Sequence, residues 1–169
     1  SIISLVENNS PKSKDILSEL YSKIGKARRI GITGPPGAGK SSLIDNMIIK
    51  YRKKGKTVAV ICIDPTSPFS GGAILGDRIR MLKHYSDKGV FIRSMASRNA
   101  SGGLSLTSSK VADVLDSFGF DIIIFETLGV GQVEIDVINE TDTVVVVLVP
   151  ESGDDIQMMK SGLIEIADL

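Results

Sequence analysis

Two stretches of this chain are apolar at nearly every position, DIIIF at 121–125 and TVVVVLV at 143–149. A strand with one face in water alternates apolar and polar residues, so these runs indicate strands that are buried on both faces. Burial on both faces is typical of a parallel sheet that is covered by helices on either side. The two runs therefore favour an α/β fold over an all-α or all-β one.

The rest of the sequence alternates between strand and helix patterns, as such a sheet requires. The predicted strands also include RRIGITG, TVAVICID and VFIRSMA, and the predicted helices are 40–55, 77–87, 108–119, 132–141 and 154–169. Right-handed crossovers then give a doubly wound, mostly parallel sheet flanked by helices, with its site in loops at the carboxyl ends of the strands. Residues 1–27 are predicted to form a short N-terminal helical extension, and residues 28–169 one domain.

Charge and composition exclude several classes of partner. Lys and Arg total 20, as do Asp and Glu, so no overall field favours nucleic acid or an anionic membrane. No apolar run approaches the roughly 18 residues needed to span a bilayer. The single cysteine, Cys62, is predicted to be a small buried strand residue and cannot form an intramolecular disulfide. We expect a cytoplasmic protein, or one of the mitochondrial matrix if eukaryotic.

The segment GITGPPGAGKSS at 31–42 follows a predicted strand and precedes a predicted helix, the context of a phosphate-binding P-loop. Its backbone N–H groups would surround phosphates, Lys40 would reach the terminal phosphates, and the Ser41 hydroxyl would bind Mg²⁺. The alternative is a glycine-rich turn in which Lys-Ser is incidental. The residues predicted to contact the nucleotide are Gly34, Pro35, Pro36, Gly37, Ala38, Gly39, Lys40, Ser41, Ser42 and Gly129.

The two adjacent prolines in this loop need an explanation, because proline has no backbone N–H to donate. Pro35 and Pro36 precede the stretch that is expected to donate, so their missing N–H groups need not weaken phosphate binding. Their fixed φ angles would stiffen the entrance of the loop. The pattern indicates a nucleoside triphosphate with Mg²⁺ and does not identify the base.

Three acidic residues stand where a metal and water site would require them. Asp64 and Glu126 end predicted strands, and Asp77 follows the PTSPFSGGAILG loop. Carboxylates at neighbouring strand ends converge, and Mg²⁺ takes oxygen ligands. Asp64 could instead be a turn residue before Pro65, and Asp77 a helix N-cap. The predicted metal ligands are Ser41, Asp64, Asp77 and Glu126, and the predicted catalytic residues are Lys40, Asp64, Asp77 and Glu126.

The segment ETLGVGQ at 126–132 is similar to the D-x-x-G switch of GTPases, with Glu in place of Asp. A glycine at 129 would let its N–H approach the γ-phosphate, so that hydrolysis can release the segment. Gln132 is either a residue that orients water or a solvated helix start. Asp154, Gln157 and Lys160 share roughly one helical face, which fits a third mobile element or a polar surface.

Taken together, GITGPPGAGKSSLID, DPTSPFSGGAILGDRIRM, ETLGVGQVE and the GDDIQ…EIADL ending resemble the MeaB/ArgK GTPases over nearly the whole chain. That family is associated with methylmalonyl-CoA mutase and is also described as LAO/AO transport kinases. The resemblance implies binding of GTP or GDP with Mg²⁺ and a chaperone role toward an adenosylcobalamin-dependent acyl-CoA mutase. It also implies a homodimer when full length, switch segments at 65–80 and 126–133, and a partner-responsive segment at 150–160.

Two departures from the family pattern stand out. Leu128 occupies a position where Val is expected, and no N-K-x-D sequence, the guanine-reading motif, occurs in these residues. The chain is therefore expected to be truncated before that motif. Two other functions stay open: an ATP-dependent kinase or ATPase of a lysine/arginine/ornithine transport system, and a nucleotide-gated metallochaperone.

Overall fold

The computed structural model describes residues 2–8, 10–64, 81–96, 103–127, 140–149 and 167–169. Five strands form one sheet in the order β3-β2-β4-β1-β5, and every described pairing is parallel. These strands are β1 (Arg28–Thr33), β2 (Val58–Asp64), β3 (Val90–Ala96), β4 (Ile122–Thr127) and β5 (Thr143–Val146). The predicted doubly wound parallel sheet is confirmed.

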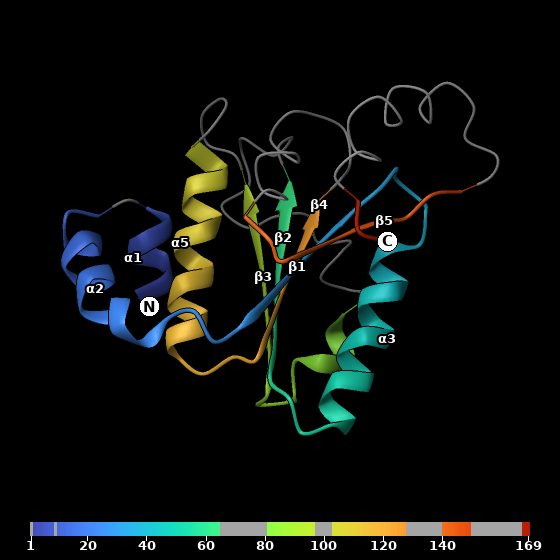
Figure 1. Ribbon diagram of the computed structural model, residues 1–169, viewed down its shortest axis with the longest axis horizontal. Helices are drawn as coiled ribbons and strands as arrows, with labels where there is room; N and C mark the ends of the chain where they lie inside the picture. Colours follow the sequence, from blue (N-terminus) through green and yellow to red (C-terminus); the bar gives the residue numbers. More distant parts are fainter. Residues whose placement is uncertain (1, 9, 65–80, 97–102, 128–139, 150–166) are drawn as a thin grey trace.

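Helices cover both faces of the sheet (Figure 1). One face carries α3 (Lys40–Lys53) and the short 3₁₀ helix η2 (Leu82–His84). The other carries α1 (Ile2–Glu7), α2 (Lys12–Leu20), the 3₁₀ helix η1 (Tyr21–Lys23) and α5 (Gly103–Ser117). None of the helices in the described part of the chain is long and apolar enough to span a membrane.

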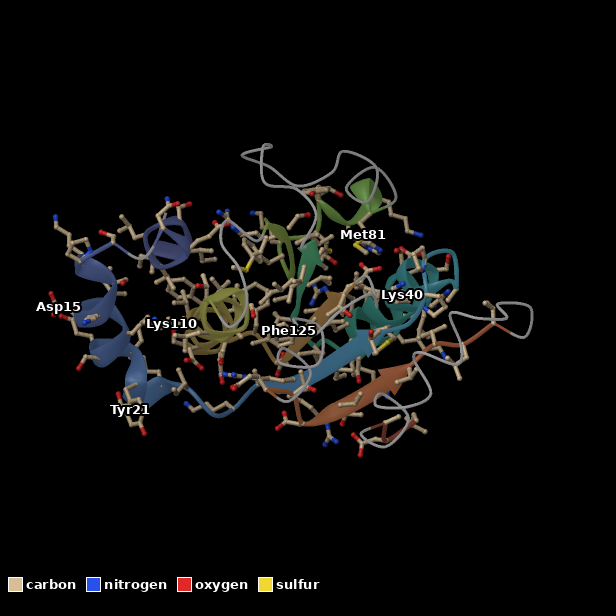
Figure 2. The ribbon with its side chains drawn as sticks, turned by 90° about the horizontal axis from the view of Figure 1, so that it is seen from above. Asp15, Tyr21, Lys40, Met81, Lys110 and Phe125 are labelled. Carbon is tan, nitrogen blue, oxygen red and sulfur yellow. The ribbon has the colours of Figure 1, made fainter. Side chains whose placement is uncertain are left out.

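The central strand β4 shows why the sequence specifies this layering. All six of its residues are buried. Ile122 and Ile124 belong to the core beneath α3, whereas Ile123 and Phe125 belong to the core beneath α5. Figure 2 shows Phe125 between the sheet and α5. Because side chains alternate along a strand, a continuous apolar run can supply both cores at once.

The prediction for TVVVVLV holds only in part. Among residues 143–147, Val144 alone is buried, and the regular strand ends at Val146. The physical reason is that β5 is the edge strand of the described sheet. The helix predicted over 154–169 is wrong at its last three residues, which are not helical: the Leu169 N–H donates to Val144 O (3.2 Å) and the Val146 N–H to Leu169 O (3.0 Å).

The N-terminal helices share the core of the sheet. Ile3 and Val6 of α1 pack in the same buried cluster as residues of α5 and β2. The turn into β1 is held by Asp116, which is 2% exposed and accepts the backbone N–H groups of Gly25 (2.7 Å) and Ala27 (3.0 Å). The division of the chain at residue 27 stays a proposal. Whether or not residues 1–27 count as a separate extension, they are joined to the sheet domain by these buried side chains and hydrogen bonds.

Asp121, immediately before β4, joins the amino ends of two strands. Its carboxylate accepts hydrogen bonds from Lys56 Nζ (2.9 Å), Thr57 N (2.8 Å) and Thr57 Oγ1 (2.9 Å). The Lys56 ammonium, followed by the two Thr57 donors, lowers the pKa of Asp121 from 3.8 to about 2. The ionised carboxylate is therefore favoured in the folded state.

We expect the substitution Asp121→Asn to lower stability near neutral pH and to reduce the loss of stability in acid. Because folding lowers the pKa of Asp121, its contribution is complete above 3.8 and disappears as pH falls toward about 2. Urea unfolding between about pH 6 and pH 3 would show the difference between wild type and variant narrowing as pH falls. Asp15→Asn, at an exposed position of α2, is the matched control. If the difference in unfolding free energy between wild type and Asp121→Asn did not change with pH, the prediction would be wrong.

Candidate nucleotide-binding site

The site is built where β1 ends and α3 begins. Three glycines of the connecting loop have positive φ angles: Gly34 (143°), Gly37 (80°) and Gly39 (93°). Residues with positive φ angles let successive backbone N–H groups point toward one side of the loop, as in anion-binding nests. Gly39 is also the N-cap of α3, so the positive end of the helix dipole faces the loop.

Gly34 is required for a second reason, which is its close approach to β5. A Cβ atom at this position would lie 2.2 Å from the carbonyl oxygen of Val147. On the same side, the Val147 N–H donates to the carbonyl oxygen of Thr33 at 2.9 Å. The entrance of the loop is therefore pressed against the chain that follows β5.

Lys40 is the first residue of α3 and is only 6% exposed. Its ammonium donates to the carbonyl oxygens of Gly34 (2.7 Å) and Pro35 (2.9 Å), so the side chain folds back over the loop. Figure 2 shows Lys40 at this end of α3, far from Asp15 and Tyr21 of the N-terminal segment. A buried positive charge above a glycine-rich loop is suited to binding phosphate.

Glu126 reaches the same place from the adjacent strand. In the sheet register it lies beside Ile32 of β1 and beside Cys62 of β2. One carboxylate oxygen accepts the Ser41 hydroxyl at 2.7 Å, and the other accepts the Cys62 thiol at 3.6 Å. Glu126 is 6% exposed, and a buried carboxylate requires such partners.

The oxygen atoms of Ser41 and Glu126 form a donor set that fits Mg²⁺, which prefers hydroxyl and carboxylate ligands. Because the Ser41 hydroxyl uses its hydrogen for the bond to the carboxylate, the lone pairs of its oxygen stay available to a cation. In the part of the chain that the structure describes, no three His, Cys, Asp or Glu side chains cluster as a metal site.

The structure brings together some of the predicted site residues. Lys40, Ser41 and the loop from Gly34 to Ser42 converge with Glu126 at one end of the sheet. Asp64 ends β2, where its backbone pairs with Ala96, and its side chain lies outside the described residues. Asp77, Gly129, Gln132 and the segments expected as switches, apart from Glu126 and Thr127, also lie outside them.

Sequence reasoning missed three contacts. Pro35 is buried and its carbonyl oxygen accepts a hydrogen bond from the Lys40 ammonium, so one of the two adjacent prolines also supplies an acceptor. Cys62 touches Glu126, and the only available signal was that positions 62 and 64 share a face of the strand. The third contact is made by His84, which is 8% exposed and whose Nε2 lies 2.6 Å from Asp45 of α3.

The contact between His84 and Asp45 attaches residues 81–87 to α3. Partial burial acts to raise the pKa of Asp45, but hydrogen bonds from Lys83 and His84 outweigh it and lower that pKa. Arg52 of the same helix pairs with Asp87 at 2.9 Å, and this bond lowers the pKa of Asp87. Met81 is buried and packs in the core beneath α3.

The geometry of a phosphate-binding loop next to a buried carboxylate can be compared with known proteins. The family model of the methylmalonyl Co-A mutase-associated GTPase MeaB matches residues 1–169, the full length of the sequence. The chain belongs to the MeaB family. The predicted family resemblance is thereby confirmed.

Individual MeaB-family relatives agree with this assignment. A Pyrococcus abyssi protein that carries a GTPase name is 56% identical over 99% of this chain and 52% of its own length. The GTPase ArgK of Escherichia coli is 37% identical over 99% of this chain and 52% of its own. The chain thus spans about half the length of these relatives.

A solved structure shows that the fold is shared as well. The crystal structure of an LAO/AO transport system kinase matches with a TM-score of 0.74 and 29% identity. The match covers 99% of this chain and 48% of that one. The P-loop nucleoside triphosphatase fold predicted from the loop and its flanking elements is therefore confirmed.

Proposed function

We propose that this chain binds GTP and hydrolyses it with Mg²⁺ as a cofactor. The observation that carries the proposal is the convergence of Lys40, Ser41 and Glu126 at the glycine-rich loop. Membership of the MeaB family and the GTPase names of the relatives support guanine as the base. Bound Mg²⁺ would neutralise charge on the phosphates while the γ-phosphoryl group is transferred to water.

In the proposed reaction the loop and Lys40 bind and orient the triphosphate. The amides from Gly37 to Ser42 would donate to phosphate oxygens, and Lys40 would move its ammonium from the loop carbonyls to the terminal phosphates. Ser41 and Glu126 would hold Mg²⁺. Asp64 and Asp77 are proposed as further residues of the metal and water site, and Gly129 as a γ-phosphate contact.

Calorimetric titration with GTP and with ATP, each in the presence of Mg²⁺, tests the proposed substrate. We expect a longer form of the protein that includes an N-K-x-D sequence to bind GTP more tightly than ATP, because residues 1–169 do not contain this guanine-reading motif. The same titration should therefore be repeated on a longer form of the protein. Equal or tighter binding of ATP by that form would exclude a GTPase.

We further propose that the GTPase cycle assists an adenosylcobalamin-dependent acyl-CoA mutase, with the full-length protein acting as a homodimer in the cytoplasm or the mitochondrial matrix. The support is the family description, which names methylmalonyl Co-A mutase. We expect the mutase to accelerate GTP hydrolysis by the full-length protein. An unchanged rate would contradict this role.

A second candidate is the transfer of phosphate to an acceptor other than water. The observation that favours it is the structural match to a protein named as a transport system kinase. Following the γ-phosphate of labelled GTP distinguishes the two functions. Release as inorganic phosphate supports the GTPase, and a labelled acceptor supports the kinase.

We expect Glu126→Gln to weaken the binding of Mg²⁺ far more than it weakens folding. The amide removes one negative charge from the metal site but keeps the size of the side chain and an oxygen acceptor for the Ser41 hydroxyl. The Mg²⁺ concentration for half-maximal hydrolysis should rise about 10–100-fold. Glu19→Gln, at an exposed position of α2, is the matched control. An unchanged Mg²⁺ titration would remove Glu126 from the metal site.

A further inference from the structure

Two buried threonines meet at the end of the sheet that carries the site. The hydroxyl of Thr127 donates to the hydroxyl oxygen of Thr33 across 2.9 Å, and both residues are 0% exposed. Burying a hydroxyl is unfavourable unless it is hydrogen-bonded. The neighbouring positions on this face, such as Phe125 and Ile123, are apolar. A polar pair here is not required for packing.

The position of this pair relates it to the site. Thr33 immediately precedes Gly34, the first residue of the phosphate loop, and Thr127 immediately follows Glu126. Ile32 and Glu126 are partners in the parallel register, so the two threonines are the next residues along each strand. Because side chains alternate, the threonines point to the α5 face, opposite Glu126. The bond therefore lies behind the site and touches neither phosphate nor metal.

The two sides of the loop entrance are fixed in different ways. Toward β5, the backbone of Val147 contacts both Thr33 and Gly34. Toward β4, the regular pairing ends at Ile32 and Glu126, and the side-chain bond between Thr33 and Thr127 extends the connection by one residue. On β1 this further residue is Thr33, the last residue of the strand before the phosphate loop.

We infer that Thr127 and Thr33 are positioning residues that set the placement of the phosphate loop relative to the Glu126 carboxylate. The inference rests on the proposed GTPase function. A small displacement between groups that bind the phosphates and groups that hold the cation slows the chemical step, and about tenfold is a moderate loss of this kind. Loss of the bond should therefore lower kcat more than it raises KM.

Four variants separate positioning from stability: Thr127→Val, Thr33→Val, the double valine variant, and Thr127→Ser. Each single valine leaves one buried hydroxyl without this partner, so its Tm should fall by roughly 3–8 °C. The double variant leaves neither hydroxyl and should regain most of that loss. The serine keeps the hydroxyl and should keep the bond.

We expect kcat for GTP to fall about tenfold in Thr127→Val and in the double variant, with KM changed less than about threefold, and to stay near wild type in Thr127→Ser. Recovery of kcat together with Tm in the double variant would overturn the inference, because the bond would then be only structural. A serine variant as slow as the valine would overturn it too.

Amide hydrogen exchange of residues 34–42 gives a readout that does not depend on turnover. Exchange should be faster in Thr127→Val and in the double variant than in wild type or Thr127→Ser. If the wild-type protein hydrolysed no GTP, the proposed function would be wrong, but the hydrogen-exchange rates of residues 34–42 would still test whether the two threonines position the loop. Unchanged exchange in the double variant would exclude that role.

Discussion

Lys40→Ala is expected to abolish tight binding of GTP while leaving the fold intact. The Lys40 ammonium lies against the phosphate loop and donates to Gly34 O (2.7 Å) and Pro35 O (2.9 Å). Removing it leaves the loop amides without a point charge for the terminal phosphates. We expect Kd for GTP to rise roughly a hundredfold or more, since hydrogen bonds to charged groups are among the strongest.

Calorimetric titration of the alanine variant with GTP measures this change directly. Lys50→Ala provides the matched control, because Lys50 is an exposed residue on the same helix, about ten residues from the loop. Lys50→Ala should unfold within about 1 kcal/mol of wild type, whereas Lys40→Ala takes this donor from the buried carbonyls of Gly34 and Pro35 and should lose about 1–3 kcal/mol. A Kd within about threefold of wild type for Lys40→Ala would mean that this loop does not bind the phosphates.

The sequence was sufficient to predict the layers of the fold and the loop, because both depend on local patterns. The apolar run of β4 and the spacing from Gly34 to Ser41 each lie within a few residues. The order of the strands could not be predicted in this way. The apolar residues of β2 and β4 are chemically alike, and no local sequence pattern indicates that β4, rather than β2, lies next to β1.

The contacts behind the site depend on that order. Cys62 meets Glu126 only because β2 and β4 are neighbours with these two residues in register. The threonine pair likewise joins residues 94 positions apart in the chain. The contact of His84 could not be predicted for a related reason: the neighbouring helix supplies Asp45 as its partner, and local sequence does not show which helix that is.

Gly34→Ala is expected to damage both stability and nucleotide binding. The backbone at Gly34 has φ 143°, a conformation that L side chains rarely adopt, and a Cβ atom would lie 2.2 Å from the backbone oxygen of Val147. Because that contact is with backbone, β5 and the loop entrance must move apart. Strain at φ and the steric conflict together should cost about 2–5 kcal/mol of unfolding free energy.

Gly37→Ala separates these two causes within the same loop. Gly37 also has a positive φ, 80°, but a Cβ atom there would meet nothing within 4 Å. It should therefore lose only the conformational part, about 1–2 kcal/mol, measured by urea unfolding alongside Gly34→Ala. The excess in Gly34→Ala measures the cost of the close approach to Val147, just after β5, together with any greater strain at a φ of 143°. If the two alanine variants were equally stable, that close approach would not hold the loop in solution, and β5 would have no part in placing the phosphate-binding amides.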